Sequence, residues 1–144
     1  MILLDTNVVS EPLRALPDPA VVTWVNAQPL ETLFLCAITV AELRSGLALL
    51  PAGKRRTALQ DALEKRVLPL FVGRVLAFDM ACTTSYAPIL ARGRSNGSPI
   101  GMADACIAAI AATHRLAVAT RDTAPFAAAG VEVIDPRGGE PSSR

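Results

Sequence analysis

The chain begins with a short apolar run that stops at a carboxylate. Its first residues are Met1-Ile2-Leu3-Leu4-Asp5-Thr6-Asn7. Three or four apolar residues bounded by polar ones are too few for a helix, and they predict a buried β-strand. Asp5 then stands at the carboxyl end of that strand, where open α/β sheets bind their ligands. The first strand therefore raises the question of whether other carboxylates reach the same edge.

Further apolar segments have the length of a strand, and helical patterns separate them. They span residues 33–38, 74–78, 116–119 and 131–134. Segment 33–38 shows no polar alternation, which is typical of a parallel strand covered on both faces. Strands that alternate with helices predict an α/β fold with a doubly wound parallel sheet.

Helices are expected between these strands. Asp18-Pro19 has the form of an N-cap followed by proline at the first helical position, so a helix is predicted from there to about Gln28. The other helical segments are predicted at 39–50, 54–66, 79–92, 101–114 and 124–129. A loop rich in Gly, Ser and Asn is predicted at 93–99.

The chain has 144 residues, the length of one ordinary domain. We expect that domain at residues 1–136 and a disordered tail at 137–144, where Gly, Pro and Ser are frequent. Three widely spaced cysteines set among apolar residues indicate a reducing compartment. No apolar run reaches the roughly 18 residues of a membrane span, and no basic segment precedes the N-terminal apolar run. A cytoplasmic protein without a membrane partner is expected.

More acidic residues share the kind of position that Asp5 has. Glu42 follows the second strand by one helical turn, Asp104 interrupts a strongly apolar helix, and Asp122 follows the fourth strand. In a parallel sheet these places lie at one edge, so the four side chains could converge. Each has a structural alternative: Asp5 and Asp122 could cap the turns that follow them, and Thr39 with Glu42 fits a capping box. Asp104 needs a partner, because a buried and unpaired carboxylate is costly.

Four carboxylates in one place repel one another and raise their pKa values unless a cation lies among them. Mg²⁺ or Mn²⁺ suits such a site, because these ions prefer oxygen ligands, bind one or two carboxylates directly and keep several waters. A centre of this kind activates water and stabilises the charge of a phosphodiester under in-line attack. Metal-dependent phosphodiester hydrolysis is the reaction that the pattern best supports.

Two other functions fit the sequence less well. A phosphatase with Asp5 as nucleophile is disfavoured. Such enzymes have an Asp-x-Asp motif, and this chain has Asn7 in place of the second aspartate. The second alternative is a non-enzymatic receiver domain, whose acidic pocket accepts a phosphate. Both alternatives need a lysine in the later part of the chain. No lysine follows Lys65, which argues against both.

Segments around the four acids resemble the motifs of PIN-domain ribonucleases. They are Leu4-Asp5-Thr6-Asn7, Thr39-Val40-Ala41-Glu42-Leu43, Ala103-Asp104-Ala105 and Thr120-Arg121-Asp122. Residues 1–14 and 119–123 are, more closely, similar to the VapC toxins of the FitB type. The similarity covers about residues 1–136, in the right order, and includes residues 68–71.

The resemblance implies a PIN-like three-layer α/β sandwich, with a five-stranded parallel sheet flanked by helices. It also implies an endoribonuclease that needs Mg²⁺ or Mn²⁺. By the same analogy, the catalytic residues that bind the metal directly or through water are Asp5, Glu42, Asp104 and Asp122. The residues expected to support them by hydrogen bonds are Thr6, Asn7 and Thr120.

Partners are implied in the same way. The resemblance implies an RNA substrate, a homodimer, and a cognate antitoxin of the VapB or FitA type, with a higher-order complex with antitoxin and DNA as a further expectation. The formal net charge of +1 leaves RNA binding to a local basic rim. Candidates for that rim are Arg44, Arg92, Arg94 and Arg121, although Arg44 could equally pair with a nearby acid or with the partner chain.

One alternative keeps the fold and removes the chemistry. It is a catalytically inactive PIN-fold module that acts only through protein interactions. The presence of all four acids argues against it.

Overall fold

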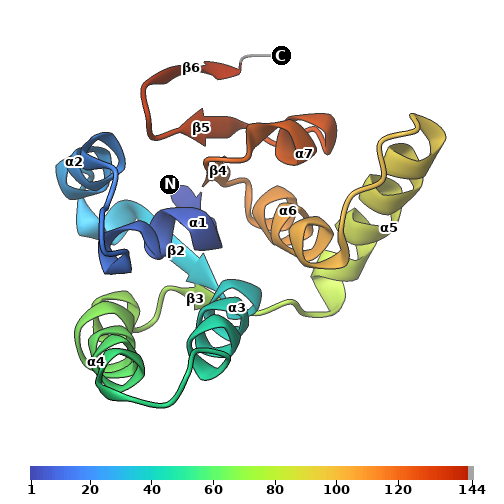
Figure 1. Ribbon diagram of the computed structural model, residues 1–144. Coiled ribbons are helices and arrows are strands. Elements are labelled where there is room, and N and C mark those ends of the chain that lie inside the picture. Colours follow the sequence, from blue (N-terminus) through green and yellow to red (C-terminus); the bar gives the residue numbers. More distant parts are fainter. Residues whose placement is uncertain (143–144) are drawn as a thin grey trace.

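The fold is built around one sheet (Figure 1), and the computed structural model describes residues 1–142, with side chains described up to residue 138. The strand order is β3-β2-β1-β4-β5-β6. The strands are β1 (Ile2–Leu4), β2 (Leu33–Cys36), β3 (Val75–Leu76), β4 (Ala117–Ala119), β5 (Val133–Asp135) and β6 (Gly139–Ser142). The first five are parallel, which confirms the predicted five-stranded parallel sheet.

Helices connect the strands as the sequence predicts. They are α1 (Thr6–Val9), α2 (Pro19–Ala27), α3 (Ala37–Ala48), α4 (Lys54–Ala62), α5 (Met80–Ser95), α6 (Met102–His114) and α7 (Thr123–Ala128). Short 3-10 turns lie at Glu11–Leu13, Leu30–Thr32 and Leu68–Phe71, and a π turn lies at Leu63–Val67. The Asp18 carboxylate caps α2 by accepting a hydrogen bond from the backbone N–H of Ala20 at 2.9 Å, which confirms the predicted helix start.

The sheet has a hydrophobic core on each face. Consecutive residues of a strand point to opposite faces, so Leu3 packs in one core and Leu4 in the other. Residues of α5, α6 and α7 fill the first core, and residues of α1, α2 and α3 fill the second. The three-layer sandwich expected from the resemblance is therefore the observed architecture (Figure 1).

The strand order places a topological switch point between β1 and β4. The chain moves from β1 to β2 and β3 on one side, and β4 and β5 lie on the other side. Helices that leave such neighbouring strands in opposite directions open a crevice at the carboxyl ends of the strands, where open α/β sheets bind ligands. Asp5 follows β1 directly, and its backbone N–H donates to the carbonyl of Ala119 at the end of β4, at 2.9 Å.

The end of the chain differs from the expected disordered tail. Residues 136–138 form a turn, and β6 pairs antiparallel with β5. The Gly, Pro and Ser content that predicts disorder also suits a tight turn, and Gly138 has a φ of 100° there. Residues 143–144 lie outside the described residues. Within residues 1–142, no helix combines the length and the apolar character needed to cross a membrane.

Glu11 is a buried acid that ties the start of the chain to its later part. Its side chain is fully buried and accepts a hydrogen bond from Arg121 Nη1 at 2.7 Å. The backbone N–H of Asp18 and the guanidinium of Arg14 also donate to it, at 2.7 and 3.2 Å. Burial raises the pKa of Glu11, but the hydrogen bonds from Asp18 and Arg14 and the charge of Arg121 outweigh it, so the pKa lies below its ordinary value.

We expect Glu11→Ala to lower the free energy of unfolding by about 2–4 kcal/mol, because Arg121 and the Asp18 amide lose a buried partner. Folding lowers the pKa of Glu11, so its ionised form stabilises the protein above the pKa of an unfolded glutamate. This contribution is lost as the pH falls through the folded-state pKa. Urea unfolding at neutral and acidic pH measures the difference, with the exposed Glu31→Ala as control. Equal unfolding midpoints for the two variants at neutral pH would contradict it.

Candidate functional site

Asp5 lies at the centre of the switch point. Only 5% of its surface is exposed, and its carboxylate accepts hydrogen bonds from the backbone N–H of Thr6 and from the hydroxyl of Thr120, both at 2.8 Å. The contact with Thr6 caps α1, so the capping role considered from the sequence is real. Burial, with smaller contributions from the charges of Glu42 and Asp122, raises the pKa of Asp5 despite these hydrogen bonds.

Glu42 does not form the capping box that the sequence allows. Helix α3 begins at Ala37, with Cys36 at the N-cap, so Thr39 lies inside the helix instead of capping it. The interpretation of Glu42 as a capping residue is wrong, because the N-cap lies at Cys36, three residues before Thr39. Its carboxylate instead accepts a hydrogen bond from the hydroxyl of Thr6 at 2.7 Å. Thr6 therefore contacts Asp5 through its backbone and Glu42 through its side chain.

Asp104 lies in the first turn of α6 and is half-buried. Burial, then the charges of Asp5, Glu42 and Asp122, raise its pKa to about 6. Among residues 1–138, no lysine or arginine forms an ion pair with Asp104. A buried carboxylate needs a partner, and no basic side chain among the described residues is that partner for Asp104.

Asp122 stands at the N-cap position of α7, but its carboxylate makes no capping hydrogen bond there. It is exposed, and its backbone N–H donates to the Thr120 hydroxyl at 3.0 Å. Because that hydroxyl donates in turn to Asp5, Thr120 links the ends of β1 and β4. The capping role considered for Asp122 is not observed, and its carboxylate stays free for other contacts within the described structure.

Asn7 completes the link between the two strand ends. Its amide oxygen accepts from the backbone N–H of Arg121 at 3.0 Å, and its amide nitrogen donates to the Thr120 hydroxyl at 3.4 Å. Thr6, Asn7 and Thr120 therefore contact the acidic residues or the backbone beside them, as a supporting role requires.

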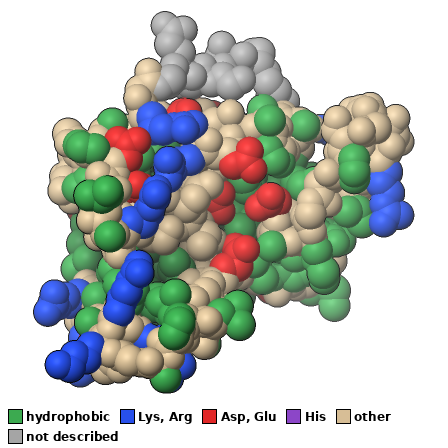
Figure 2. Space-filling view, viewed as in Figure 1, with side chains coloured by type: hydrophobic (Ala, Val, Ile, Leu, Met, Phe, Trp, Pro, Cys, Tyr) green, Lys and Arg blue, Asp and Glu red, His purple; other side chains and the backbone are tan. Residues whose placement is uncertain are grey.

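The four carboxylates interact electrostatically but are not tightly packed. Each of Asp5, Glu42 and Asp122 acts on the pKa of Asp104. Among the side chains that the structure describes, which are those of residues 1–138, no three of His, Cys, Asp or Glu are close enough to hold a metal ion directly. This spacing fits a hydrated divalent ion, which takes one or two carboxylates and keeps several waters that the others orient. Figure 2 shows acidic side chains around a hollow in the middle of one face, with a diagonal line of basic side chains to the left of them.

The arginines proposed for a basic rim divide into two groups. Arg44 pairs with Glu64, with N to O distances of 2.8 and 3.1 Å, which is the nearby-acid alternative for this residue. Arg121 is committed to Glu11. Arg92 and Arg94 lie in the last turn of α5, and both are exposed.

Sequence reasoning missed Glu11. It lies only six residues after Asp5, and its environment depends on Arg121, which is far away in the sequence. Among the described residues, Asp5 and Glu11 are the charged side chains classed as buried. The acidic residue inside the otherwise mostly apolar segment 8–13 was the only signal in the sequence.

Known proteins are similar to this chain along almost its whole length. The model of the PIN domain family matches residues 2–131. The chain is 57% identical to the VapC ribonuclease Y4jK of Sinorhizobium fredii, over 94% of this chain and 97% of that protein. It is 52% identical to the toxin FitB of Neisseria gonorrhoeae, over 94% of this chain and 98% of that protein.

A solved structure agrees with these relatives. The structure of FitAB bound to the IR36 DNA fragment superposes with a TM-score of 0.93 at 49% identity, over 97% of this chain and 98% of that one. The two structures therefore share the same fold over almost their whole lengths. The chain belongs to the PIN-domain family, within the group that includes the VapC and FitB proteins.

Proposed function

We propose that this protein is a metal-dependent endoribonuclease and acts as the toxin of a VapBC-type toxin-antitoxin pair. The observation that carries the proposal is the acidic site at the switch point. Four carboxylates from separate elements interact there, and Asp104 has a pKa of about 6 with no basic side chain paired to it within residues 1–138. A cation is the partner that such a site lacks, and the similar VapC ribonuclease indicates RNA as the substrate.

The site residues divide the work by their contacts. Asp5, Glu42, Asp104 and Asp122 would hold Mg²⁺ or Mn²⁺, some directly and some through water. When bound, that ion would supply a Lewis acid and an activated water for attack on a phosphodiester. The carboxylates that do not touch the ion would orient its waters and accept their protons. The hydrogen bonds of Thr6, Asn7 and Thr120 would keep these carboxylates in place.

The proposed partners follow from the relatives and from the charge of the site. An antitoxin of the VapB or FitA type would block the site by presenting an arginine, which would compete with the metal for the same carboxylates. The FitAB complex with a DNA fragment supports a higher-order assembly with antitoxin and DNA. A homodimer in the cytoplasm is part of the same proposal. The inactive PIN-fold interaction module remains the alternative, and no observation favours it over the enzyme.

Purified protein free of antitoxin is expected to cut a mixture of structured RNAs in Mg²⁺ or Mn²⁺, and EDTA is expected to stop the reaction. We expect Asp5→Asn and Asp104→Asn each to reduce the rate by at least about a hundredfold, because each removes a charge that binds the metal or its waters. Asp61→Asn is the matched control. Asp61 is an exposed aspartate on α4, and it pairs with Lys65 on the π turn that follows. Gel analysis of the RNA gives both the rates and the cut sites.

Each result of that experiment decides something about the proposal. Equal cutting by wild type, Asp5→Asn and Asp104→Asn would assign the activity to a contaminant. No cutting at all, together with Mn²⁺ binding that needs the two aspartates, would point to a missing substrate. No cutting and no metal binding would reject the enzyme and leave the interaction module.

The pKa of Asp104 leads to a second prediction, on stability without metal. Folding raises this pKa from 3.8 to about 6, so the ionised form of Asp104 destabilises the metal-free fold fully above that pH. This cost decreases as the pH falls below about 6, and it is lost only below the unfolded-state pKa of 3.8. We therefore expect Asp104→Asn to raise the free energy of unfolding by about 1 kcal/mol at neutral pH in EDTA, a value reduced to allow for solvent screening. At about pH 3.5 most of the advantage should be gone, because Asp104 is then mostly protonated in the unfolded chain as well as in the folded protein.

Urea unfolding in EDTA at the two pH values measures this difference. Saturating Mn²⁺ at neutral pH should reverse the order, because the metal stabilises only the folded wild type with its full set of carboxylates. A variant less stable than wild type in EDTA at neutral pH would show that Asp104 is not under repulsion.

A further inference from the structure

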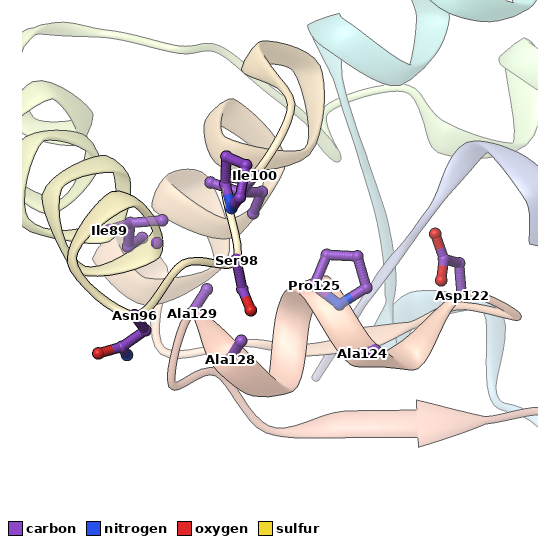
Figure 3. A pocket seen from close by; sticks show the side chains of 11 residues that line it. Ile89, Asn96, Ser98, Ile100, Asp122, Ala124, Pro125, Ala128 and Ala129 are labelled. Carbon is purple, nitrogen blue, oxygen red and sulfur yellow. The ribbon is translucent and has the colours of Figure 1, made fainter.

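A pocket of about 530 Å³ opens beside Asp122, between α5, the loop 96–101 and α7 (Figure 3). Its volume is in the range of small-molecule sites. Asp122 belongs to its lining and also to the four interacting carboxylates. The pocket therefore borders the candidate metal site at Asp122. No part of the proposed function uses it so far.

The outer wall of the pocket is held in place by backbone contacts. The backbone N–H of Ser98 donates to the carbonyl of Gly93 at 2.9 Å, which folds the loop back onto α5. A Cβ atom at Gly93 would lie 3.0 Å from the Ser98 carbonyl oxygen, so this close approach favours glycine. The loop that the sequence presents only as a run of Gly, Ser and Asn is thus a formed wall of the pocket.

The chemistry of the lining fits a flat, mainly apolar ligand with polar edges. Ala124, Pro125 and Ala128 of α7 line one side, with Ile89 of α5 and Ile100 of the loop opposite them (Figure 3). Asn96 and Ser98 add an amide and a hydroxyl, which can donate to or accept from a base edge.

The charges around the pocket favour a base over a phosphate as its occupant. Apart from Asp122, the lining carries no charged side chain, so a phosphate would find no cation inside. Arg92 lies just outside, with its Nη1 3.5 Å from the carbonyl oxygen of Ala129, a lining residue. A neutral base in the pocket would therefore have an acidic metal site on one side and a cation at the border.

We propose that this pocket receives one base of the RNA strand, next to the phosphodiester that is cut. The inference rests on the proposed ribonuclease function. Proteins that recognise single-stranded RNA commonly splay a base out of its stack and contact its faces and edges. With a phosphate at the carboxylates, the chain of the RNA would pass Asp122, and the adjacent base would enter the pocket. The pocket then selects which bases are accepted at that position of the cleavage site.

Filling the pocket tests this. In Ala128→Phe an aromatic ring would occupy the space, and Ala127→Phe is the matched control, because Ala127 is the exposed neighbour on α7 that does not line the pocket. The probes are nonamers of U, A, C and G. Binding is measured by fluorescence anisotropy in Mg²⁺, with each substitution placed separately on an Asp104→Asn background, where cleavage is expected to be too slow to alter the RNA during the measurement. We expect Ala128→Phe to weaken binding of the preferred nonamer about tenfold, the scale of one lost base contact, and Ala127→Phe to leave it within about twofold.

A change in the RNA gives the same information without altering the fold. One abasic nucleotide is moved along the preferred nonamer, and cleavage by protein with an intact site is measured. With wild type, a single position beside the cut should show a loss of about tenfold in kcat/KM. Ala128→Phe should show that loss already with intact RNA and no further loss with the abasic one, because the two changes remove the same contact.

The outcomes separate the pocket from the enzyme. Metal-dependent cleavage with equal binding by the two phenylalanine variants overturns the base pocket and leaves the ribonuclease intact. A loss of dimer or of antitoxin binding in Ala128→Phe, with RNA binding unchanged, also overturns it and identifies a protein occupant. If the wild type does not cleave RNA and Asp104→Asn does not bind it, the proposed function is rejected and the base pocket with it.

Discussion

The buried carboxylate of Asp5 connects the carboxyl ends of two neighbouring strands, and the geometry of the site depends on how that carboxylate is held. The hydroxyl of Thr120 and the backbone N–H of Thr6 each donate to it at 2.8 Å. These two contacts connect the end of β1 with the end of β4 across the switch point. They offset only part of the cost of burial, since the pKa of Asp5 remains raised. The fold therefore keeps an anionic site that a bound cation would stabilise.

A second ionic network holds the segment that carries Asp122. Glu11 binds the side chain of Arg121, and Arg137 donates to the Arg121 carbonyl at 2.8 Å while pairing with Asp135. The side chain and the backbone of Arg121 are thus both held by other residues, and this also fixes the backbone of the next residue, Asp122. A buried ion pair is weak evidence for stability, but it restricts alternative arrangements in proteins where its partners meet from distant segments. Here it fixes the end of β4 relative to the turn after α1.

The strands could be predicted from the sequence because they depend on short patterns, and the positions of the four acids near the strand ends follow from the same patterns, while their role at a metal site stays a prediction. An apolar run that stops at a carboxylate indicates a strand end, and parallel strands share one edge. The start of α3 could not be predicted in this way. Thr39 is a residue type that favours the N-cap, whereas the observed N-cap is Cys36, whose side chain makes no capping hydrogen bond. Glu11 and the pocket beside Asp122 were also out of reach. Both arise from contacts between segments about 25 to 110 residues apart, and no local pattern records those contacts.

The pairing of the arginines bears on how RNA would be held. Arg44 and Arg121, two of the four expected for a basic rim, already have acidic partners. With a net charge of +1 and four carboxylates at the site, phosphate attraction by the protein alone would be weak. On the proposed function, the metal ion would supply the missing positive charge at the cut phosphate, and Arg92 and Arg94 at the end of α5 would supply the rest. Base contacts in the pocket would then account for a larger share of the affinity than in strongly basic RNA-binding proteins.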